Sequence, residues 1–220
     1  MKRVGILGGT FNPIHISHLL IARAALNELS LEKIIFMPSK NPPHKQDLDV
    51  ASDDDRMNMV RFAIEDEPGF EASALELNRD GLTYTSETLA ILRDMNPDTK
   101  YYFIIGGDSL ETFDKWHEPD KILRRCALVC AGRAEQESFY IRQRIMALIE
   151  KFKTADFTPE IHYINSPKLD ISSFMIRKYI SFDISTLGMT KPSVSNYIFY
   201  QRVGANQPND HLPNQTNLYF

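Results

Sequence analysis

The chain has 220 residues, of which 43% are hydrophobic and 25% are charged, which is ordinary for a globular protein with a substantial core. Its formal net charge of −4 argues against a general nucleic-acid-binding protein, because such proteins carry a basic face. No apolar run approaches the ~20 residues of a membrane span, and the N-terminus lacks the apolar region of a signal peptide. We therefore expect a cytoplasmic protein that binds neither a membrane nor nucleic acid.

Apolar runs typical of strands alternate along the chain with stretches of helical periodicity. The predicted strands cover residues 3–7, 33–37, 70–74, 101–105, 127–131 and 161–164. The predicted helices between them cover residues 18–29, 53–67, 86–95, 120–125 and 139–152. Strands that alternate with helices favour right-handed crossovers and a parallel sheet. The predicted fold class is therefore α/β, a Rossmann-like parallel sheet with helices on both faces.

The last third of the chain departs from this alternation. Two further helices are predicted at residues 172–180 and 193–200, and they would form a small helical subdomain packed on the sheet. From residue 204 the sequence is rich in Asn, Gln and Pro, which is typical of a mobile polar tail. The predicted division is an α/β domain over 1–165, a helical C-terminal subdomain over 166–203 and a tail over 204–220.

The two cysteines, Cys126 and Cys130, lie in one apolar run. On a strand they would point to the same face, yet too far apart for a disulfide. A metal site would need further ligands nearby, and the sequence shows none there. We therefore expect buried, reduced thiols.

The most informative stretch, residues 6–18, joins the first predicted strand to the first predicted helix. Gly8 and Gly9 let the backbone approach a ligand closely, because they lack a Cβ. The helix that follows begins with free backbone N–H groups and the positive end of its dipole. His15 and His18, three residues apart at this helix start, can both donate to one phosphate chain. Together these features predict a site that binds a triphosphate.

A glycine-rich turn after a first strand also occurs in dehydrogenases that bind a dinucleotide. That fingerprint requires G-x-G-x-x-G and an acidic residue at the end of the second strand. Here the two glycines are adjacent, no third follows, and the second predicted strand ends in Phe-Met-Pro-Ser at residues 36–39. A dehydrogenase is therefore disfavoured.

The stretch from Gly8 to His18, Gly-Gly-Thr-Phe-Asn-Pro-Ile-His-Ile-Ser-His, resembles the signature of nucleotidyltransferases with paired phosphate-binding histidines. Within that superfamily the chain most resembles the bacterial nicotinate mononucleotide adenylyltransferases, over about residues 2–200. The likeness recurs in the family's order at residues 42–45 (Pro-Pro-His-Lys), 84–89 (Tyr-Thr-Ser-Glu-Thr-Leu), 105–110 (Ile-Gly-Gly-Asp-Ser-Leu), 116 (Trp) and 171–177 (Ile-Ser-Ser-Phe-Met-Ile-Arg). The first and last motifs alone identify only the superfamily, but the set is specific.

The resemblance implies an enzyme of NAD biosynthesis that moves AMP from ATP to nicotinate mononucleotide and releases pyrophosphate. The catalytic residues would be His15, His18 and Arg177, acting as electrostatic stabilisers of the triphosphate. The residues expected at ATP are Gly8, Gly9, Thr10, Phe11, His15, His18, Gly106, Asp108, Ile171, Ser172, Ser173 and Arg177. Mg²⁺ would be held by phosphate oxygens and water, with no metal site built by the protein.

The expected ATP-binding residues outside the first motif come from two places. Ser172 or Ser173 can cap a helix in which Arg177 lies about one turn further on, which by itself describes an ordinary helix start. Beside the first motif it resembles the family's second phosphate-binding element. Gly106 and Asp108 follow a predicted strand at its carboxyl end, where open α/β sheets bind ligands. By resemblance Asp108 contacts the adenosine ribose or organises the cleft, or it caps the helix that follows.

Two positions depart from the family's pattern. Phe174 stands where the family commonly has threonine, so no polar role is assigned to it. Ser17 stands between the histidines where the family commonly has glycine, and it leaves His15 and His18 in register.

For the acceptor, the resemblance implies contacts with Thr85, Trp116, His44 and Lys45. Thr85 starts a predicted helix whose free N–H groups favour a carboxylate over an amide. Trp116, the only tryptophan, would stack on the cationic pyridine ring, although a lone tryptophan more often packs in a core. His44 and Lys45 follow two prolines on a loop, where they would meet the mononucleotide phosphate or simply be solvated.

Other functions stay open at this point. The same chemistry on nicotinamide mononucleotide, on both acceptors or on phosphopantetheine is a near alternative, although the chain length and Trp116 disfavour the last. A non-catalytic nucleotide-binding module is disfavoured because both histidines, Asp108 and Arg177 are retained. The sequence does not determine the oligomeric state, and a homo-oligomer is one of the open alternatives.

Overall fold

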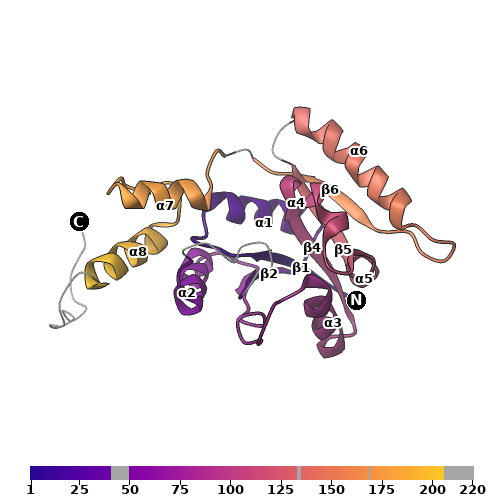
Figure 1. Ribbon diagram of the computed structural model, residues 1–220, viewed down its shortest axis with the longest axis horizontal. Coiled ribbons are helices and arrows are strands. Elements are labelled where there is room, and N and C mark those ends of the chain that lie inside the picture. The colour runs from indigo at the N-terminus through magenta and orange to yellow at the C-terminus, as the bar shows by residue number, and fades with distance from the viewer. Residues whose placement is uncertain (41–49, 133–134, 168, 206–220) are drawn as a thin grey trace.

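The computed structural model describes residues 1–40, 50–132, 135–167 and 169–205 (Figure 1). The elements follow one another as β1 (Lys2–Gly9), α1 (Ile16–Glu28), β2 (Lys33–Pro38), α2 (Asp53–Ile64), β3 (Phe70–Ala72), α3 (Thr85–Met95), β4 (Thr99–Gly106), α4 (Gly107–Glu111), the short 3₁₀ helix η1 (Phe113–Lys115), α5 (Pro119–Arg125), β5 (Ala127–Gly132), α6 (Glu135–Phe152), β6 (Ile161–Asn165), α7 (Ser173–Ser181) and α8 (Pro192–Ala205).

The six strands form one parallel sheet in the order β3-β2-β1-β4-β5-β6. From β1 the chain moves outward to β2 and β3, and it then returns to place β4 on the other side of β1. This reversal creates a switch point between β1 and β4, where open α/β sheets bind ligands. Leu7 is in register with Ile104, so the carboxyl ends of both strands lie at the same edge of the sheet. The predicted α/β fold class is confirmed.

Both faces of the sheet are covered by helices, because successive residues of each strand point to opposite sides. One buried cluster joins strand residues such as Ile34 and Ile104 to apolar side chains of α1 and α2. The other joins Ile6 and Phe103 to apolar side chains of α3, α5 and α6. Near-continuous apolar strands are what a parallel sheet buried on both faces requires.

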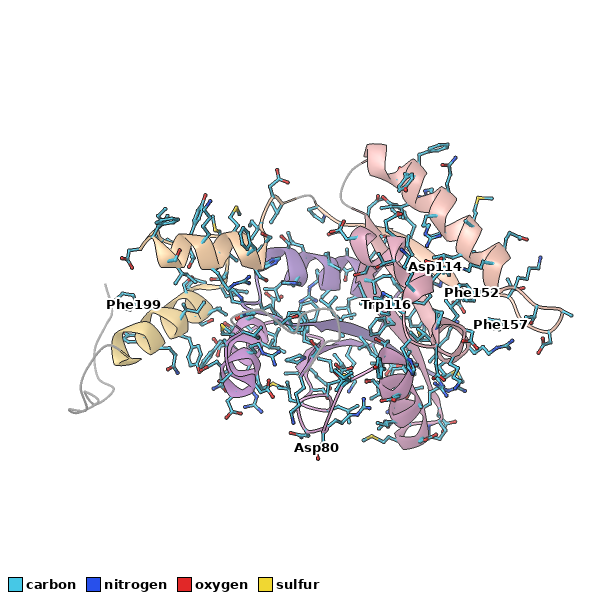
Figure 2. All side chains as sticks on the ribbon, in the orientation of Figure 1. Asp80, Asp114, Trp116, Phe152, Phe157 and Phe199 are labelled. Carbon is cyan, nitrogen blue, oxygen red and sulfur yellow. The ribbon has the colours of Figure 1, made fainter. Side chains whose placement is uncertain are left out.

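The helices α7 and α8 lie beside α1 and α2 at one end of the molecule (Figure 1). Figure 2 shows Phe199 of α8 far from Phe152 and Phe157, which lie at the opposite end. The Tyr197 hydroxyl of α8 donates to Asp55 of α2 at 2.7 Å. The backbone N–H of Ile16 donates to the carbonyl of Met189 at 2.9 Å, which ties the segment between α7 and α8 to the start of α1. The predicted helical part is thus packed against the first helices, while its boundary at residue 166 stays a prediction.

The structure differs from the sequence-based expectation in several bounds. The helix α1 begins at Ile16, two residues earlier than predicted, because His15 already occupies its N-cap position. The strand β3 is shorter than residues 70–74, and α6 begins at Glu135 instead of residue 139. The short elements α4 and η1 have no periodicity long enough to indicate them in the sequence.

Cys126 and Cys130 are buried and free, as predicted. Burial raises the pKa of each thiol to about 12, so both stay protonated and unreactive at neutral pH. None of the helices in the described part of the chain combines the length and apolar character needed to cross a bilayer.

Candidate active site

Gly8 and Gly9 end β1 at the carboxyl edge of the sheet, directly before the loop that carries the first motif. The loop folds back over the strand end at Phe11, which has a φ of 49°. A Cβ at Gly9 would lie 3.2 Å from the Phe11 ring, so glycine leaves room for this return. The sequence indicated these glycines for ligand approach, and the structure adds a packing reason for one of them.

The Phe11 ring is buried and supports the second histidine. It packs against Phe36 of β2 with ring centroids 6.1 Å apart. On its other side it meets the His18 ring edge-on, with centroids 5.1 Å apart. Phe11 was expected among the ATP-binding residues, and its side chain holds the His18 imidazole in place.

His15 and His18 form the start of α1. His15 is the N-cap residue and only 6% exposed, while His18 is the third residue of the helix. The backbone N–H of His15 donates to Nδ1 of His18 at 3.2 Å, and the ring centroids lie 3.8 Å apart. Because Nδ1 accepts this bond, a neutral His18 carries its proton on Nε2. His18 thus offers an N–H donor without having to be charged.

The start of α7 docks onto the same loop. Ser172 caps α7 by accepting from the backbone N–H of Met175 at 3.2 Å. The Ser173 hydroxyl donates to the carbonyl of Pro13 at 2.8 Å, and Nη1 of Arg177 donates to the carbonyl of Asn12 at 2.7 Å. These contacts bring together the two motifs that the sequence predicted to share a phosphate site, although they lie far apart in the chain.

The two departures from the family's pattern occupy different environments. Phe174 is 69% exposed, so its side chain contributes little to the core. The guanidinium of Arg177 lies 6.0 Å from the centroid of its ring. Ser17 is buried in the first turn of α1, and its hydroxyl has no hydrogen-bond partner among the described residues. Ile171 is half-buried two residues before α7.

Gly106 and Asp108 lie at the end of β4, beside the end of β1. Gly106 is the N-cap residue of α4, and Asp108 is the second residue of that helix. The alternative in which Asp108 caps this helix is therefore wrong, because the glycine backbone already occupies the cap. The Asp108 carboxylate is exposed. A Cβ at Gly106 would meet no described atom within 4 Å, so open space lies beside this strand end.

The expected acceptor contacts come from two separate elements. Thr85 is the first residue of α3, and Tyr84 is its N-cap residue. The Tyr84 ring lies against the ring of His117, with centroids 4.1 Å apart and planes at 33°. Sequence reasoning did not select Tyr84 or His117. Their positions directly beside Thr85 and Trp116 were the one available signal.

Trp116 lies just before α5 and is half-buried (Figure 2). Its ring packs against Phe113 and Phe103, with centroids 5.4 and 6.3 Å away. The packing role and the stacking role are compatible, because a half-buried ring can pack on one side and offer its other surface to a ligand. His44 and Lys45, expected at the acceptor phosphate, lie outside the described residues.

Arg56 of α2 supports this site from within the fold, and the sequence did not indicate it. It is 1% exposed, although arginine is rarely buried so fully. Its Nη1 donates to the carbonyls of Thr10 at 2.9 Å and Ser39 at 2.7 Å, and its Nε donates to Ala51 at 3.2 Å. Its Nη2 pairs with Asp53. One guanidinium thus joins the loops after β1 and β2 to the start of α2.

A second polar network lies under the start of α3. The Thr88 hydroxyl donates to Glu76 at 2.7 Å, and Nη1 of Arg79 donates to that hydroxyl at 3.0 Å. Arg79 also pairs with Glu87 in the first turn of α3. Burial raises the pKa of Glu76 above its ordinary value, although the hydrogen bond from Thr88 and the charge of Arg79 oppose this shift.

Comparison with known proteins places these motifs in a family. The family model described as cytidylyltransferase-like matches residues 6–179. A relative from Lachnoclostridium phytofermentans is 41% identical over 90% of this chain and 96% of its own length. Another from Caldicellulosiruptor bescii is 40% identical over 89% of this chain and 95% of its own length. Both carry the name "Probable nicotinate-nucleotide adenylyltransferase".

Solved structures share the fold. The Plasmodium falciparum nicotinic acid mononucleotide adenylyltransferase complexed with APC superposes with a TM-score of 0.69 and 21% identity, and its complex with NaAD gives 0.70 and 22%. Each match covers 94% of this chain and 99% of that structure. At this low identity, the likeness shows a common architecture over almost the whole chain.

We expect Arg56→Met to destabilise the protein by about 2–4 kcal/mol, because it leaves three carbonyls and a carboxylate without their donor. Turnover should fall as well, since the loop that leads into His15 loses one of the side chains that hold it. Chemical unfolding and steady-state kinetics would measure the two effects. Arg61→Met, an exposed arginine on the same helix, is the control and should change stability by less than about 0.5 kcal/mol. Equal effects of the two variants would contradict this role for Arg56.

The raised pKa of Glu76 predicts a pH-dependent stability. A carboxyl whose pKa is raised on folding contributes stability below its unfolded pKa, and this contribution is lost as the pH rises through the folded pKa. Glu76→Gln keeps an acceptor for Thr88 and cannot ionise. Its melting temperature relative to the parent should therefore increase by a few degrees between pH 4 and pH 7. Glu65→Gln, at an exposed position, should show no such trend, and a flat difference for Glu76→Gln would refute the prediction.

Proposed function

This chain belongs to the cytidylyltransferase-like family and, within it, to the nicotinate-nucleotide adenylyltransferases, and we propose that the residues gathered at the ends of β1 and β4 carry out the reaction. The enzyme moves AMP from ATP to nicotinate mononucleotide, giving nicotinate adenine dinucleotide and pyrophosphate. One observation carries the residue assignment. Ser173 and Arg177 bond to Pro13 and Asn12, 160 and 165 residues earlier, and so join α7 to the loop that leads into His15.

The triphosphate would lie between the starts of α1 and α7. Both helix starts carry positive dipole ends, which favour a phosphate. His18 adds an Nε2–H donor, and Arg177 keeps four N–H donors beyond the one on Asn12. These groups would stabilise the charge that moves onto pyrophosphate while an acceptor phosphate oxygen attacks the α-phosphorus in line. No side chain needs to form a covalent intermediate.

Gly106 and Asp108 would receive the adenosine. The open space beside Gly106 admits a sugar or base against the strand end, and the exposed Asp108 carboxylate can accept from ribose hydroxyls. Such contacts would orient the α-phosphorus toward the acceptor, which is the main way a phosphoryl-transfer site accelerates its reaction.

Mg²⁺ fits this donor set as a companion of ATP. Imidazoles, hydroxyls and guanidinium groups bind phosphate oxygens directly, and the described residues contain no group of three or more His, Cys, Asp or Glu side chains that could hold a metal. Triphosphate oxygens and water would supply its ligands, and when bound it would neutralise phosphate charge. As an enzyme that consumes ATP, the protein would work in the cytoplasm.

The acceptor would lie between the start of α3 and the segment before α5. Backbone N–H groups near Thr85 would bind the nicotinate carboxylate, and the Trp116 ring would lie against the pyridine. His44 and Lys45 remain our candidates for its phosphate.

We expect His15→Ala and His18→Ala each to lower turnover by about two to three orders of magnitude, as for the loss of a transition-state donor. Dinucleotide formation from ATP and nicotinate mononucleotide, followed by chromatography, would measure it. His162→Ala, at a histidine of β6 that pairs with Glu160, is the control and should keep normal turnover. A histidine variant with near-normal turnover would remove that residue from the mechanism.

The enzyme should prefer nicotinate over nicotinamide mononucleotide by roughly a hundredfold or more in kcat/KM, because an amide sets its own donors against the N–H groups of α3. Competing the two acceptors in one reaction would measure this preference. Trp116→Ala should weaken both acceptors and leave the preference largely unchanged, because stacking senses the substituent weakly. Equal use of acid and amide by the parent enzyme would refute the carboxylate site near Thr85.

A further inference from the structure

The proposed acceptor site has two walls, which belong to different helices, α3 and α5. Hydrogen bonds outside the site connect these helices. One wall is the start of α3 at Thr85, and the other is the segment of Trp116 and His117 that leads into α5. Nothing in the covalent chain fixes their separation, because β4 and α4 lie between them in sequence. Their spacing comes from packing on the same face of the sheet, from the contact between the Tyr84 and His117 rings, and from contacts between α3 and α5.

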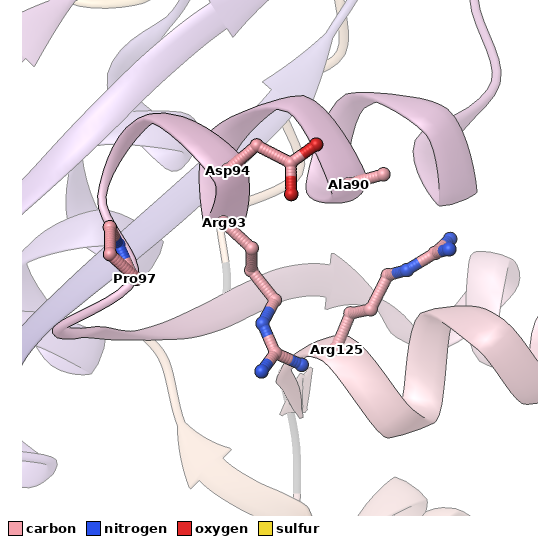
Figure 3. Close-up of a pocket in the computed structure, with 5 residues that line it drawn as sticks. All are labelled: Ala90, Arg93, Asp94, Pro97 and Arg125. Atoms are coloured by element: carbon pink, nitrogen blue, oxygen red, sulfur yellow. The ribbon is translucent and has the colours of Figure 1, made fainter.

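Two arginines make reciprocal contacts between these helices. Nη1 of Arg93, on α3, donates to the carbonyl of Arg124 at 3.2 Å. In the other direction, Nη1 of Arg125, at the end of α5, donates to the carbonyl of Ser86 at 2.8 Å. Figure 3 shows Arg93 and Arg125 on facing helices, lining a pocket of about 420 Å³ together with Ala90, Asp94 and Pro97. Neither arginine forms an ion pair with a carboxylate within the described part of the chain.

The two contacts reach opposite ends of α3. Arg93 lies in its last turn, far from the acceptor residues. Ser86 is the second residue of α3, directly after Thr85, and its side chain is completely buried. The bond from Arg125 is therefore made to the helical turn whose N–H groups would receive the nicotinate carboxylate.

The other end of the Arg125 connection leads to the stacking wall. Arg125 ends the seven-residue helix α5, and Glu118, directly after His117, is its N-cap residue. Glu118 has a φ of 52°, which fixes a sharp turn between the Trp116 segment and the helix. This turn and the short helix connect Arg125 to the Trp116 segment, so a shift of α5 at Arg125 would be passed on to that segment.

We propose that Arg125 is a positioning residue for acceptor binding, which holds the N–H groups near Thr85 at a fixed distance from the ring of Trp116. This proposal rests on the proposed function, since it assumes that the acceptor lies between these two walls. A displacement of even 1 Å between two binding walls weakens the orientation of a substrate strongly. The ATP site, built from β1, α1, α7 and the end of β4, does not depend on this contact.

The test is a pair of matched variants, Arg125→Met and Arg93→Met, each of which removes one guanidinium from the same pocket and retains an apolar stem. Arg125→Met should raise the KM for nicotinate mononucleotide about tenfold, leave the KM for ATP within about twofold and reduce the preference for acid over amide. Arg93→Met should leave all three unchanged. Arg125→Lys keeps a charged donor on a shorter side chain. It should therefore recover part of the acceptor affinity that Arg125→Met loses.

The outcomes separate the positioning role from a merely structural one. An unchanged acceptor KM in Arg125→Met, an equal rise in both KM values, or the same acceptor effect in Arg93→Met would each overturn the proposal. If the methionine variant does not fold, a rise confined to the acceptor KM in Arg125→Lys supports it and no rise overturns it. A parent enzyme that makes no dinucleotide from ATP and nicotinate mononucleotide would instead refute the proposed function itself.

Discussion

The candidate active site depends on how the carbonyls of one loop are satisfied. The loop after β1 leaves the sheet, so its carbonyls need hydrogen-bond donors from outside the ladder of the sheet. Arg56 bonds to Thr10, Arg177 bonds to Asn12, and Ser173 bonds to Pro13. Three side chains from two distant helices therefore hold the loop, and through it the start of α1.

The first motif could be predicted because its geometry is local. Two histidines three residues apart, shortly after a strand and two glycines, both lie at the helix start. This arrangement depends only on residues close together in the sequence. The α/β pattern predicted a parallel sheet, whereas the pairing of β1 with β4, which both end in glycine, came from the structure. The docking of α7 did not follow from spacing, because an isolated capped helix carries no information about its neighbour. There the family resemblance supplied what local physics could not.

Arg56 shows where such reasoning ends. An arginine directly after a run of three aspartates looks like part of a solvated helix start, and Asp53 does pair with it. Its burial is a consequence of two loops folding over α2, which no local pattern encodes.

Asp108 shows a different limit. Aspartate is a favoured N-cap, yet Gly106 occupies the cap because β4 runs straight into α4 without a turn. The preference of aspartate for the N-cap position was therefore outweighed by the geometry of the strand end.

Arg56 of α2 and Arg177 of α7 both bond to the loop after β1, yet they have different roles. Arg56 is fully buried, bonds to three carbonyls and pairs with Asp53. Its positive charge is therefore neutralised within the fold and is not accessible to a ligand. Arg177 is only half-buried, uses one N–H on Asn12 and forms no ion pair with a carboxylate of the described chain. Its positive charge is therefore available to a ligand. Under the proposed function, a chain of net charge −4 would bind a highly charged anion because Arg177 stays uncompensated near the starts of α1 and α7.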